Sequence, residues 1–233
     1  FILGFVMILK DDKGTVVDYF WNFPYDIKNI GLSLSGGMDS ALILWCLVEM
    51  LRGRQHFAKD AKIWCTHGYD ITRTKTHSYE AAQRVLDWVK WHQKDNTFIQ
   101  PLHVFGYEKK ENISKEVLHY SNYEYIQRRY KVPFIIRGVT QGWDKDRPLG
   151  KSGDKNEAEL KEISKSTWIL PFGAVNKKFI AYQYKRHALE GLRAITVSCT
   201  ADTPEPCQKC YWCDERYWAF GDYDGGHKRR IVL

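Results

Sequence analysis

The architecture of this chain follows from one run of residues: Ile30-Gly31-Leu32-Ser33-Leu34-Ser35-Gly36-Gly37-Met38-Asp39-Ser40-Ala41-Leu42-Ile43-Leu44-Trp45. An apolar segment, 30–34, precedes a tight glycine turn, and a second apolar segment follows it. This order predicts a strand, a turn and a helix. Glycines let backbone N–H groups close around a phosphate, and the helix N-terminus adds partial positive charge. The run therefore predicts a binding site for an anion.

The turn has no lysine where a Walker P-loop requires Gly-Lys-Ser/Thr after four intervening residues. It instead resembles the PP-loop of N-type ATP pyrophosphatases, Ser-Gly-Gly-x-Asp-Ser, with the residues Ser35, Gly36, Gly37, Met38, Asp39 and Ser40. The resemblance implies that these residues bind ATP and pyrophosphate. It also implies that ATP is cleaved between its α and β phosphates, that an acceptor is adenylated and that pyrophosphate leaves. The alternative is a glycine turn that only packs.

Four apolar β-type segments alternate with segments long enough for helices. The predicted strands are 30–34, 62–65, 98–105 and 132–139, and the predicted helices between them are 40–51, 76–91 and 113–130. Such alternation predicts an α/β fold with a doubly wound parallel sheet covered on both faces. Ligands of these sheets bind at the carboxyl ends of the strands, where Ser35, Thr66 and Gly138 fall. We therefore expect Thr66 and Gly138 to contribute to the ATP site.

The remaining pattern predicts three regions. Residues 1–28 form an N-terminal extension, 29–195 the ATP-binding α/β domain, and 196–233 a small cysteine-rich segment. Within the domain, 141–158 is rich in Gly, Asp, Lys and Pro, which is typical of a loop. Such a loop at the ligand edge serves either as a lid or as a plain surface excursion. A helix over 157–165, a short apolar run over 168–172 and a helix over 176–189 follow.

Composition narrows the class of protein. The chain has 233 residues, of which 44% are hydrophobic and 15% aromatic, and this excludes a largely disordered chain. Its formal net charge of +7 suits a phosphate-bearing partner, whether ATP, RNA or DNA, or simply favours solubility. No apolar stretch approaches the roughly 20 residues of a membrane helix. We expect no membrane partner and a cytoplasmic location, while a homodimer stays open.

Four of the six cysteines gather in one segment: Cys199, Cys207, Cys210 and Cys213. Four thiolates at this spacing match a tetrahedral zinc site, whose closure would fold the turn-rich segment. An iron–sulfur cluster also accepts four cysteines. We favour structural zinc because the sequence shows no evident redox partner. The other two, Cys46 and Cys65, lie in apolar runs and are expected to be buried small hydrophobes.

The two ends together resemble the 7-cyano-7-deazaguanine synthase (QueC) family. The tail matches its Ser-Cys-x(7)-Cys-x-x-Cys-x-x-Cys-x-x-Arg-x-x-Ala-Phe pattern, with Arg216, Ala219 and Phe220 after the cysteines. The segment Pro171-Phe172-x-x-x-Asn176-Lys177-x-x-Ile180 resembles another family segment. The resemblance implies the adenine nucleotide alpha hydrolase-like fold with a small C-terminal zinc-binding segment. Two further family segments, which hold the deazapurine, are absent or reduced to the partial match at 143–148.

The resemblance implies an ATP-dependent ligase. It would adenylate 7-carboxy-7-deazaguanine and convert it, with ammonia, to the amide and then to the nitrile, with release of AMP and pyrophosphate. Lys177 would lie near the ATP phosphates, and Asp39 would contact Mg²⁺. Asp39 and Lys177 are thus the expected catalytic residues. Asp144, Asp146 and Arg147 are the candidates for the substrate loop, and Asp144 is a second candidate contact for Mg²⁺.

Three other functions stay open from the sequence. A PP-loop tRNA sulfur transferase would use the same adenylation on a base carbonyl. A QueC-like enzyme could act on a deazapurine attached to DNA or protein, in phage modification or antiphage defence. A zinc-stabilised nucleic-acid-binding protein would bind with steep salt dependence and release no pyrophosphate.

Overall fold

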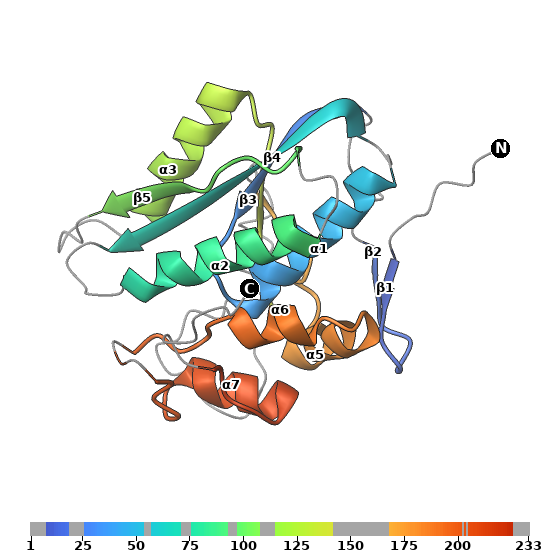
Figure 1. The fold of residues 1–233 in the computed structure, drawn as a ribbon, viewed down its shortest axis with the longest axis vertical. Helices are drawn as coiled ribbons and strands as arrows, with labels where there is room; N and C mark the ends of the chain where they lie inside the picture. The colour runs from blue at the N-terminus through green and yellow to red at the C-terminus, as the bar shows by residue number, and fades with distance from the viewer. Residues whose placement is uncertain are drawn as a thin grey trace.

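A computed structural model describes residues 8–18, 26–53, 57–70, 76–92, 97–107, 115–141, 168–201, 203 and 205–225. Its centre is a five-stranded sheet with strand order β5-β4-β3-β6-β7 (Figure 1). All neighbouring strands in it pair in parallel. The strands are β3 (Ile27–Ser33), β4 (Phe57–Asp70), β5 (His103–Tyr107), β6 (Ile135–Arg137) and β7 (Trp168–Ile169).

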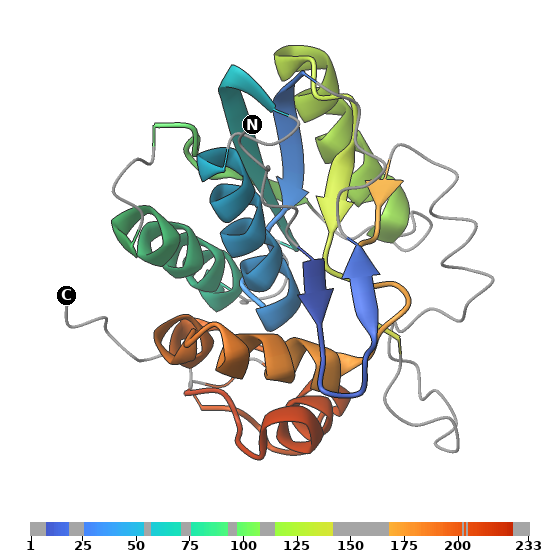
Figure 2. The ribbon, with the colours of Figure 1, turned by 90° about the vertical axis from the view of Figure 1, so that its right-hand side faces the viewer.

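Helices cover both faces of this sheet. Figure 2 shows α1 (Met38–Arg52) and α2 (Thr76–His92) on one face and α3 (Lys115–Tyr130) on the other. The predicted doubly wound α/β class is therefore confirmed. Apolar side chains fill the space on each side. Leu32 and Leu42 belong to the larger core cluster, whereas Ile126 and Trp168 belong to a smaller cluster beneath α3.

The strand boundaries differ from those predicted, and proline explains part of the difference. Strand β5 begins at His103 rather than at residue 98, although Ile99 forms an isolated bridge with Ile63. Pro101 lies between Ile99 and His103 and has no N–H to donate to a neighbouring strand. Strand β4 is longer than the predicted 62–65. The helix predicted over 157–165 lies outside the described residues.

The C-terminal helices gather at the edge of the sheet where β3 ends (Figure 1). They are α5 (Lys177–Arg186), α6 (Glu190–Ile195) and α7 (Tyr211–Phe220), and α5 contacts both α1 and α7. A hairpin of β1 (Ile8–Lys10) and β2 (Val16–Asp18) is anchored to α5, because Gln183 Nε2 donates to the Lys10 carbonyl at 3.0 Å. The carboxyl edge of the sheet is thus covered by segments from the second half of the chain.

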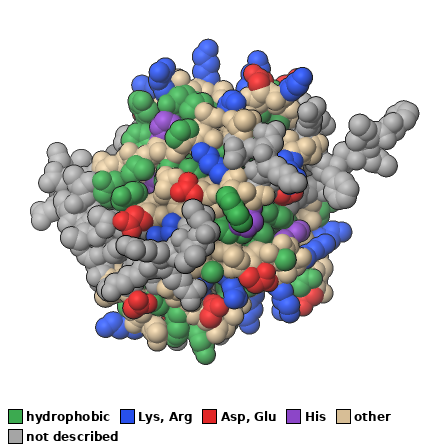
Figure 3. Space-filling view, viewed as in Figure 1, with side chains coloured by type: hydrophobic (Ala, Val, Ile, Leu, Met, Phe, Trp, Pro, Cys, Tyr) green, Lys and Arg blue, Asp and Glu red, His purple; other side chains and the backbone are tan. Residues whose placement is uncertain are grey.

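The surface carries mixed charge. On the face seen in Figure 3, the described Lys and Arg side chains are interspersed with acidic and apolar ones. This distribution suits solubility as well as phosphate binding, so the net charge of +7 does not by itself identify a partner. Among the described helices, none has the length and apolar character needed to cross a membrane.

Candidate functional site

The glycine turn lies between β3 and α1, at the carboxyl edge of the sheet. Gly36 has φ +80°, and a Cβ there would lie 2.7 Å from both Ala81 Cβ and Ala82 N. Only glycine meets both conditions without strain, because other residues rarely adopt positive φ and a Cβ would overlap α2. Gly37 is the N-cap of α1 and offers no capping side chain. The first N–H groups of α1 are therefore left for an anion.

Two serine hydroxyls close the turn on itself. Ser35 N–H donates to Ser40 Oγ at 3.2 Å, and the two hydroxyl oxygens lie 3.0 Å apart at hydrogen-bond distance. Gly37 N–H donates to Ser35 Oγ at 3.3 Å. These bonds fix the shape of the loop backbone. The loop is thus preorganised by residues of its own motif.

The structure brings Gly138 and Thr66 to this loop. A Cβ on Gly138, which follows β6, would lie 2.7 Å from Ser40 N and 2.8 Å from Asp39 Cβ. The close approach requires a glycine there. Thr66 in β4 accepts a hydrogen bond from Leu34 N–H through its carbonyl oxygen at 2.8 Å. Its hydroxyl Oγ1 is buried and has no hydrogen-bond partner among the described residues.

His67, next to Thr66, supports the loop from beneath. Its Nδ1 donates to the Leu34 carbonyl at 2.8 Å, and its Nε2 lies 3.2 Å from Ser78 Oγ. Burial lowers the pKa of His67 below its ordinary value, although the bond to Leu34 acts in the opposite direction. The imidazole is therefore neutral at pH 7 and fixes the strand end from which the loop departs.

Lys177 joins the loop from a distant part of the sequence. It begins α5, and its Nζ lies 2.5 Å from Asp39 Oδ2 and 3.4 Å from Glu215 Oε2. Its side chain is only 7% exposed, so it is not a solvated surface lysine. Burial alone would lower the pKa of Lys177, but Asp39 and Glu215 raise it above its ordinary value. The ammonium therefore stays charged inside the protein.

Two residues of this site were not predicted. Glu215 of α7 is buried and holds the second carboxylate at Lys177. Tyr184 of α5 is also buried, and its hydroxyl donates to the Met38 carbonyl at 2.9 Å. The one signal for Glu215 was its place two residues after the last cysteine. Nothing in the sequence marked Tyr184, because its contact depends on the packing of α5 against α1.

The four clustered cysteines come together in space. Their Sγ atoms all lie within 4.8 Å of one another. Ala201 N–H and Cys207 N–H both donate to Cys199 Sγ, at 3.4 and 3.3 Å. The segment is fixed from the other side by Asp224, whose Oδ2 accepts from the N–H groups of Ser198 and Cys199 at 2.8 and 2.9 Å. Asp224 is another residue that the sequence pattern did not reveal.

These thiols fit one tetrahedral ion. Zinc–sulfur bonds of about 2.3 Å place the four sulfurs about 3.8 Å apart. In a 4Fe–4S cluster each thiolate binds a different iron, so the sulfurs stand farther apart than around one ion. Burial raises the pKa of Cys199. It acts in the same direction on Cys207, but hydrogen bonds from Lys209 N–H and neighbouring thiols lower the pKa of that thiol to about 7. Metal binding would displace the remaining protons.

Three further residues were predicted on the substrate loop. Asp144, Asp146 and Arg147 lie outside the described residues, so their role on the substrate loop stays a prediction.

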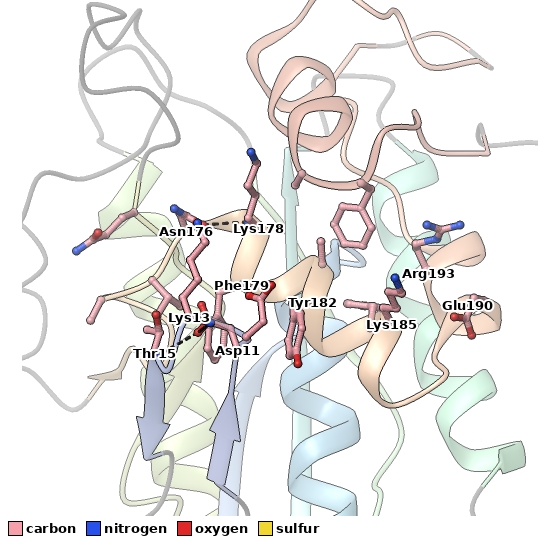
Figure 4. Close-up of a pocket in the computed structure, with 18 residues that line it drawn as sticks. Asp11, Lys13, Thr15, Asn176, Lys178, Phe179, Tyr182, Lys185, Glu190 and Arg193 are labelled. Carbon is pink, nitrogen blue, oxygen red and sulfur yellow. Dashed lines mark hydrogen bonds between the residues drawn. The ribbon is translucent and has the colours of Figure 1, made fainter.

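A groove of about 710 Å³ lies along α5 (Figure 4), lined by Lys178, Tyr182 and Lys185 together with the β1–β2 turn, α6 and the end of α7. Its lining includes neither Lys177 nor any residue of the loop. The groove therefore contains none of the predicted phosphate-binding residues and adjoins the loop through Tyr184, whose hydroxyl donates to the Met38 carbonyl.

No protein-family model and no curated protein sequence matches this chain. Among solved structures, it is similar to the U34-tRNA thiolase NcsA from Methanococcus maripaludis, solved with its 4Fe–4S cluster. The two share 12% identity and a TM-score of 0.52 over 86% of this chain and 69% of the thiolase. The likeness shows that the chain shares the fold of this thiolase. This confirms the expected fold, whereas the narrower resemblance to 7-cyano-7-deazaguanine synthases stays a prediction.

Proposed function

We propose that this protein is an ATP-dependent adenylating enzyme that binds the nucleotide phosphates over residues 35–40. The observation that carries the proposal is the contact of Lys177 Nζ with Asp39 Oδ2 at 2.5 Å. These two residues belong to separate sequence motifs, and each was expected at the phosphates on its own. Their meeting beside the uncapped start of α1 supports the proposal, because an anion bound there would be near both a charged lysine and helix N–H groups.

The acceptor we infer is 7-carboxy-7-deazaguanine. A carboxylate is a poor electrophile because its leaving group would be oxide. Attack of its oxygen on the α-phosphorus of ATP forms an acyl adenylate and releases pyrophosphate. Ammonia then displaces AMP to give the amide. The amide oxygen then attacks the α-phosphorus of a second ATP and releases a second pyrophosphate, and loss of AMP with the two amide protons gives the nitrile.

The chain contributes positioning and charge neutralisation to these steps. Ser35, Gly36, Gly37 and Ser40 would hold the departing pyrophosphate, and Lys177 would neutralise it. Asp39 would contact Mg²⁺, which neutralises phosphate charge when bound. Asp39 Oδ1 fits this role because it is buried without a hydrogen-bond partner among the described residues. Zinc at the four cysteines would be structural, since it would fix the start of α7, from which Glu215 reaches Lys177.

The proposed acceptor can be tested by incubating the zinc-loaded protein with Mg·ATP, ammonium and 7-carboxy-7-deazaguanine. Mass spectrometry should detect the amide first and then the nitrile, together with AMP. Omission of ammonium should abolish both the amide and the nitrile. Unchanged acid after prolonged incubation with active, ATP-binding protein would contradict this acceptor and favour a deazapurine attached to DNA or protein, which can be offered in the same assay.

A tRNA sulfur transferase is the second candidate, and the fold likeness to the thiolase favours it. Such an enzyme would adenylate a base carbonyl of tRNA. The close spacing of the four Sγ atoms argues for one metal ion rather than a cluster. The metal content and visible absorbance of protein purified without oxygen distinguish the two candidate functions. Zinc and no visible absorbance support the ligase, whereas iron with the broad visible absorbance of an iron–sulfur cluster supports the transferase.

A further inference from the structure

Arg137 is a charged residue beside the loop that the proposed phosphate site does not use. It is the last residue of β6, and its Cα pairs with that of Ser33 at the end of β3. The next residue, Gly138, lies against Ser40 and Asp39 at the start of α1. Arg137 therefore stands at the carboxyl edge of the sheet, where ligands of such folds bind.

The side chain of Arg137 lies on the face of the sheet that α3 covers. Successive residues of a strand point to opposite faces, and a Cβ on Gly138 would point at the start of α1. The Arg137 guanidinium carbon lies 5.8 Å from the centroid of the Tyr123 ring on α3 and 4.5 Å from that of Trp168 on β7. Arg137 thus points away from the start of α1, where the phosphates are proposed to bind.

These two rings hold the guanidinium without using its hydrogen-bond donors. Both rings are buried, and the Tyr123 hydroxyl lies 2.8 Å from Ser33 Oγ, at hydrogen-bond distance. A cation–π contact needs no hydrogen-bond acceptor, and a guanidinium has five N–H donors. Among the described residues, none forms a hydrogen bond or an ion pair with the side chain of Arg137, which is half-buried. Its donors are therefore available to a ligand.

We propose that Arg137 binds the carboxylate of the acceptor and orients it for attack on ATP. The inference rests on the proposed function, because it concerns the acceptor of that reaction. A planar guanidinium matches a carboxylate through two parallel N–H···O bonds. Lys177 and the start of α1 serve the phosphates on the α1 side of the strand, so the carboxylate is the anion that Arg137 would receive on the α3 side.

The charge of the acceptor changes during the reaction, and this change makes the role of Arg137 measurable. One carboxylate oxygen attacks the α-phosphorus of ATP, the bond from that phosphorus to the bridging oxygen breaks, and pyrophosphate leaves with the electron pair. The acyl adenylate and the amide no longer carry the charge of the carboxylate. Arg137 should therefore matter for the acid and much less for the neutral amide, which enters the second activation.

Two variants of Arg137 and one control separate charge from geometry. Arg137→Gln removes the guanidinium and its charge, whereas Arg137→Lys keeps the charge but cannot form two parallel bonds to a carboxylate. Arg129→Gln is the matched control. Arg129 also lies over a tyrosine ring, 5.8 Å from the centroid of Tyr130, but it belongs to the last turn of α3.

The test is steady-state kinetics of zinc-loaded protein with Mg·ATP and either 7-carboxy-7-deazaguanine with ammonium or the preformed amide. Arg137→Gln should lower kcat/KM for the acid about 10- to 100-fold, mainly through a higher KM, because it loses hydrogen bonds to a charged group. Its kcat/KM for the amide and its KM for ATP should change less than about threefold. Arg137→Lys should lose about tenfold with the acid, and Arg129→Gln should match wild type with both substrates.

The outcomes separate this inference from the proposed function. Equal losses with acid and amide, a raised KM for ATP or an unchanged kcat/KM for the acid would each overturn the role of Arg137 and leave the proposed acceptor in place. Wild type that converts neither the acid nor the amide would overturn the proposed acceptor and this inference with it.

If Arg137→Gln does not fold, calorimetric titration of the wild type decides. In the presence of Mg²⁺ and an ATP analogue with a methylene group between the α and β phosphates, the acid should bind at least about tenfold more tightly than the amide. Equal affinities for the acid and the amide would overturn the inference.

Discussion

The glycine loop and the cysteine segment are held in shape by different means. The loop is fixed by packing: Gly36 lies against the start of α2, Gly138 lies against the start of α1, and serine hydroxyls close the turn. The described part of the cysteine segment before α7 forms neither helix nor strand, and its four thiols converge on one point. The first is therefore a property of the folded sheet, whereas the second depends on what the thiols bind.

Because the two regions are held in shape differently, different changes should destabilise them. Changes to packing should damage the loop and spare the metal, whereas loss of metal should loosen α7 and leave β3 and α1 in place. The two regions also touch, because Val197 N–H donates to the Gly36 carbonyl at 3.0 Å and the Lys177–Glu215 contact joins α5 to α7. Variants in each region test this view, because each should damage its own region and spare the other.

The largest effect is expected from Cys210→Ser. The variant should lose bound zinc and about 5 kcal/mol or more of stability, since structural zinc contributes on the order of 10 kcal/mol. Hydrogen exchange should rise much more in α7 than in α1. Elemental analysis and exchange mass spectrometry measure both. Cys46→Ala serves as the control and should keep its zinc; equal loss of protection in α1 and α7 would contradict the separation of the two regions.

Lys177→Ala should reduce adenylation by a factor of about 10² or more, because one preorganised charge contact is lost. The sequence alone predicts that the fold survives this change. The buried position of Lys177 alters that expectation, since Asp39 and Glu215 lose their shared cation and stability should fall by about 3 kcal/mol. Steady-state kinetics and thermal unfolding measure the two effects.

Lys178→Ala is the internal control for this variant. Lys178 Nζ lies 4.5 Å from the centroid of the Trp218 ring, a contact expected to contribute under about 1 kcal/mol. It should retain near-normal activity. Matching activity losses in the two variants would show that position 177 has no special role.

Gly36→Ala should destabilise the protein by about 2–4 kcal/mol, because the new Cβ combines positive φ with overlap against α2. The melting temperature should fall by about 5–15 °C, while the zinc content stays unchanged. Gly14→Ala is the matched control. Gly14 has φ +81°, but a Cβ added there would meet no atom within 4 Å, so only the backbone cost of about 1 kcal/mol should be measured. Equal shifts would refute the packing account of the loop.

A smaller effect concerns pH. The pKa of His67 is lowered by burial, so the unfolded chain takes up a proton below pH 6.5 that the folded protein resists. Stability from this residue is present above the unfolded pKa and is lost as pH falls below it, at up to about 1.4 kcal/mol per pH unit. His67→Gln should have a shallower decline in denaturant unfolding between neutral and acidic pH. Burial also lowers the pKa of His103 and His187, so only the difference from wild type reports on His67.

Local patterns predicted the fold and part of the candidate site. The strand–turn–helix around Gly36 and the spacing of the cysteines are properties of short segments, and the structure contains both. Glu215, Tyr184 and Asp224 could not be predicted in the same way. Their contacts depend on how α5 and α7 pack at the end of the sheet, and no repeated pattern in a single sequence records that packing.

The central claim is that this loop cleaves ATP between the α and β phosphates. The most direct measurement is chromatography of the nucleotide products from zinc-loaded protein incubated with γ-labelled Mg·ATP, ammonium and 7-carboxy-7-deazaguanine. We predict AMP and labelled pyrophosphate in equal amounts. Lys177→Ala should form both products more slowly, by a factor of about 10² or more. ADP and labelled inorganic phosphate as the products would contradict the account.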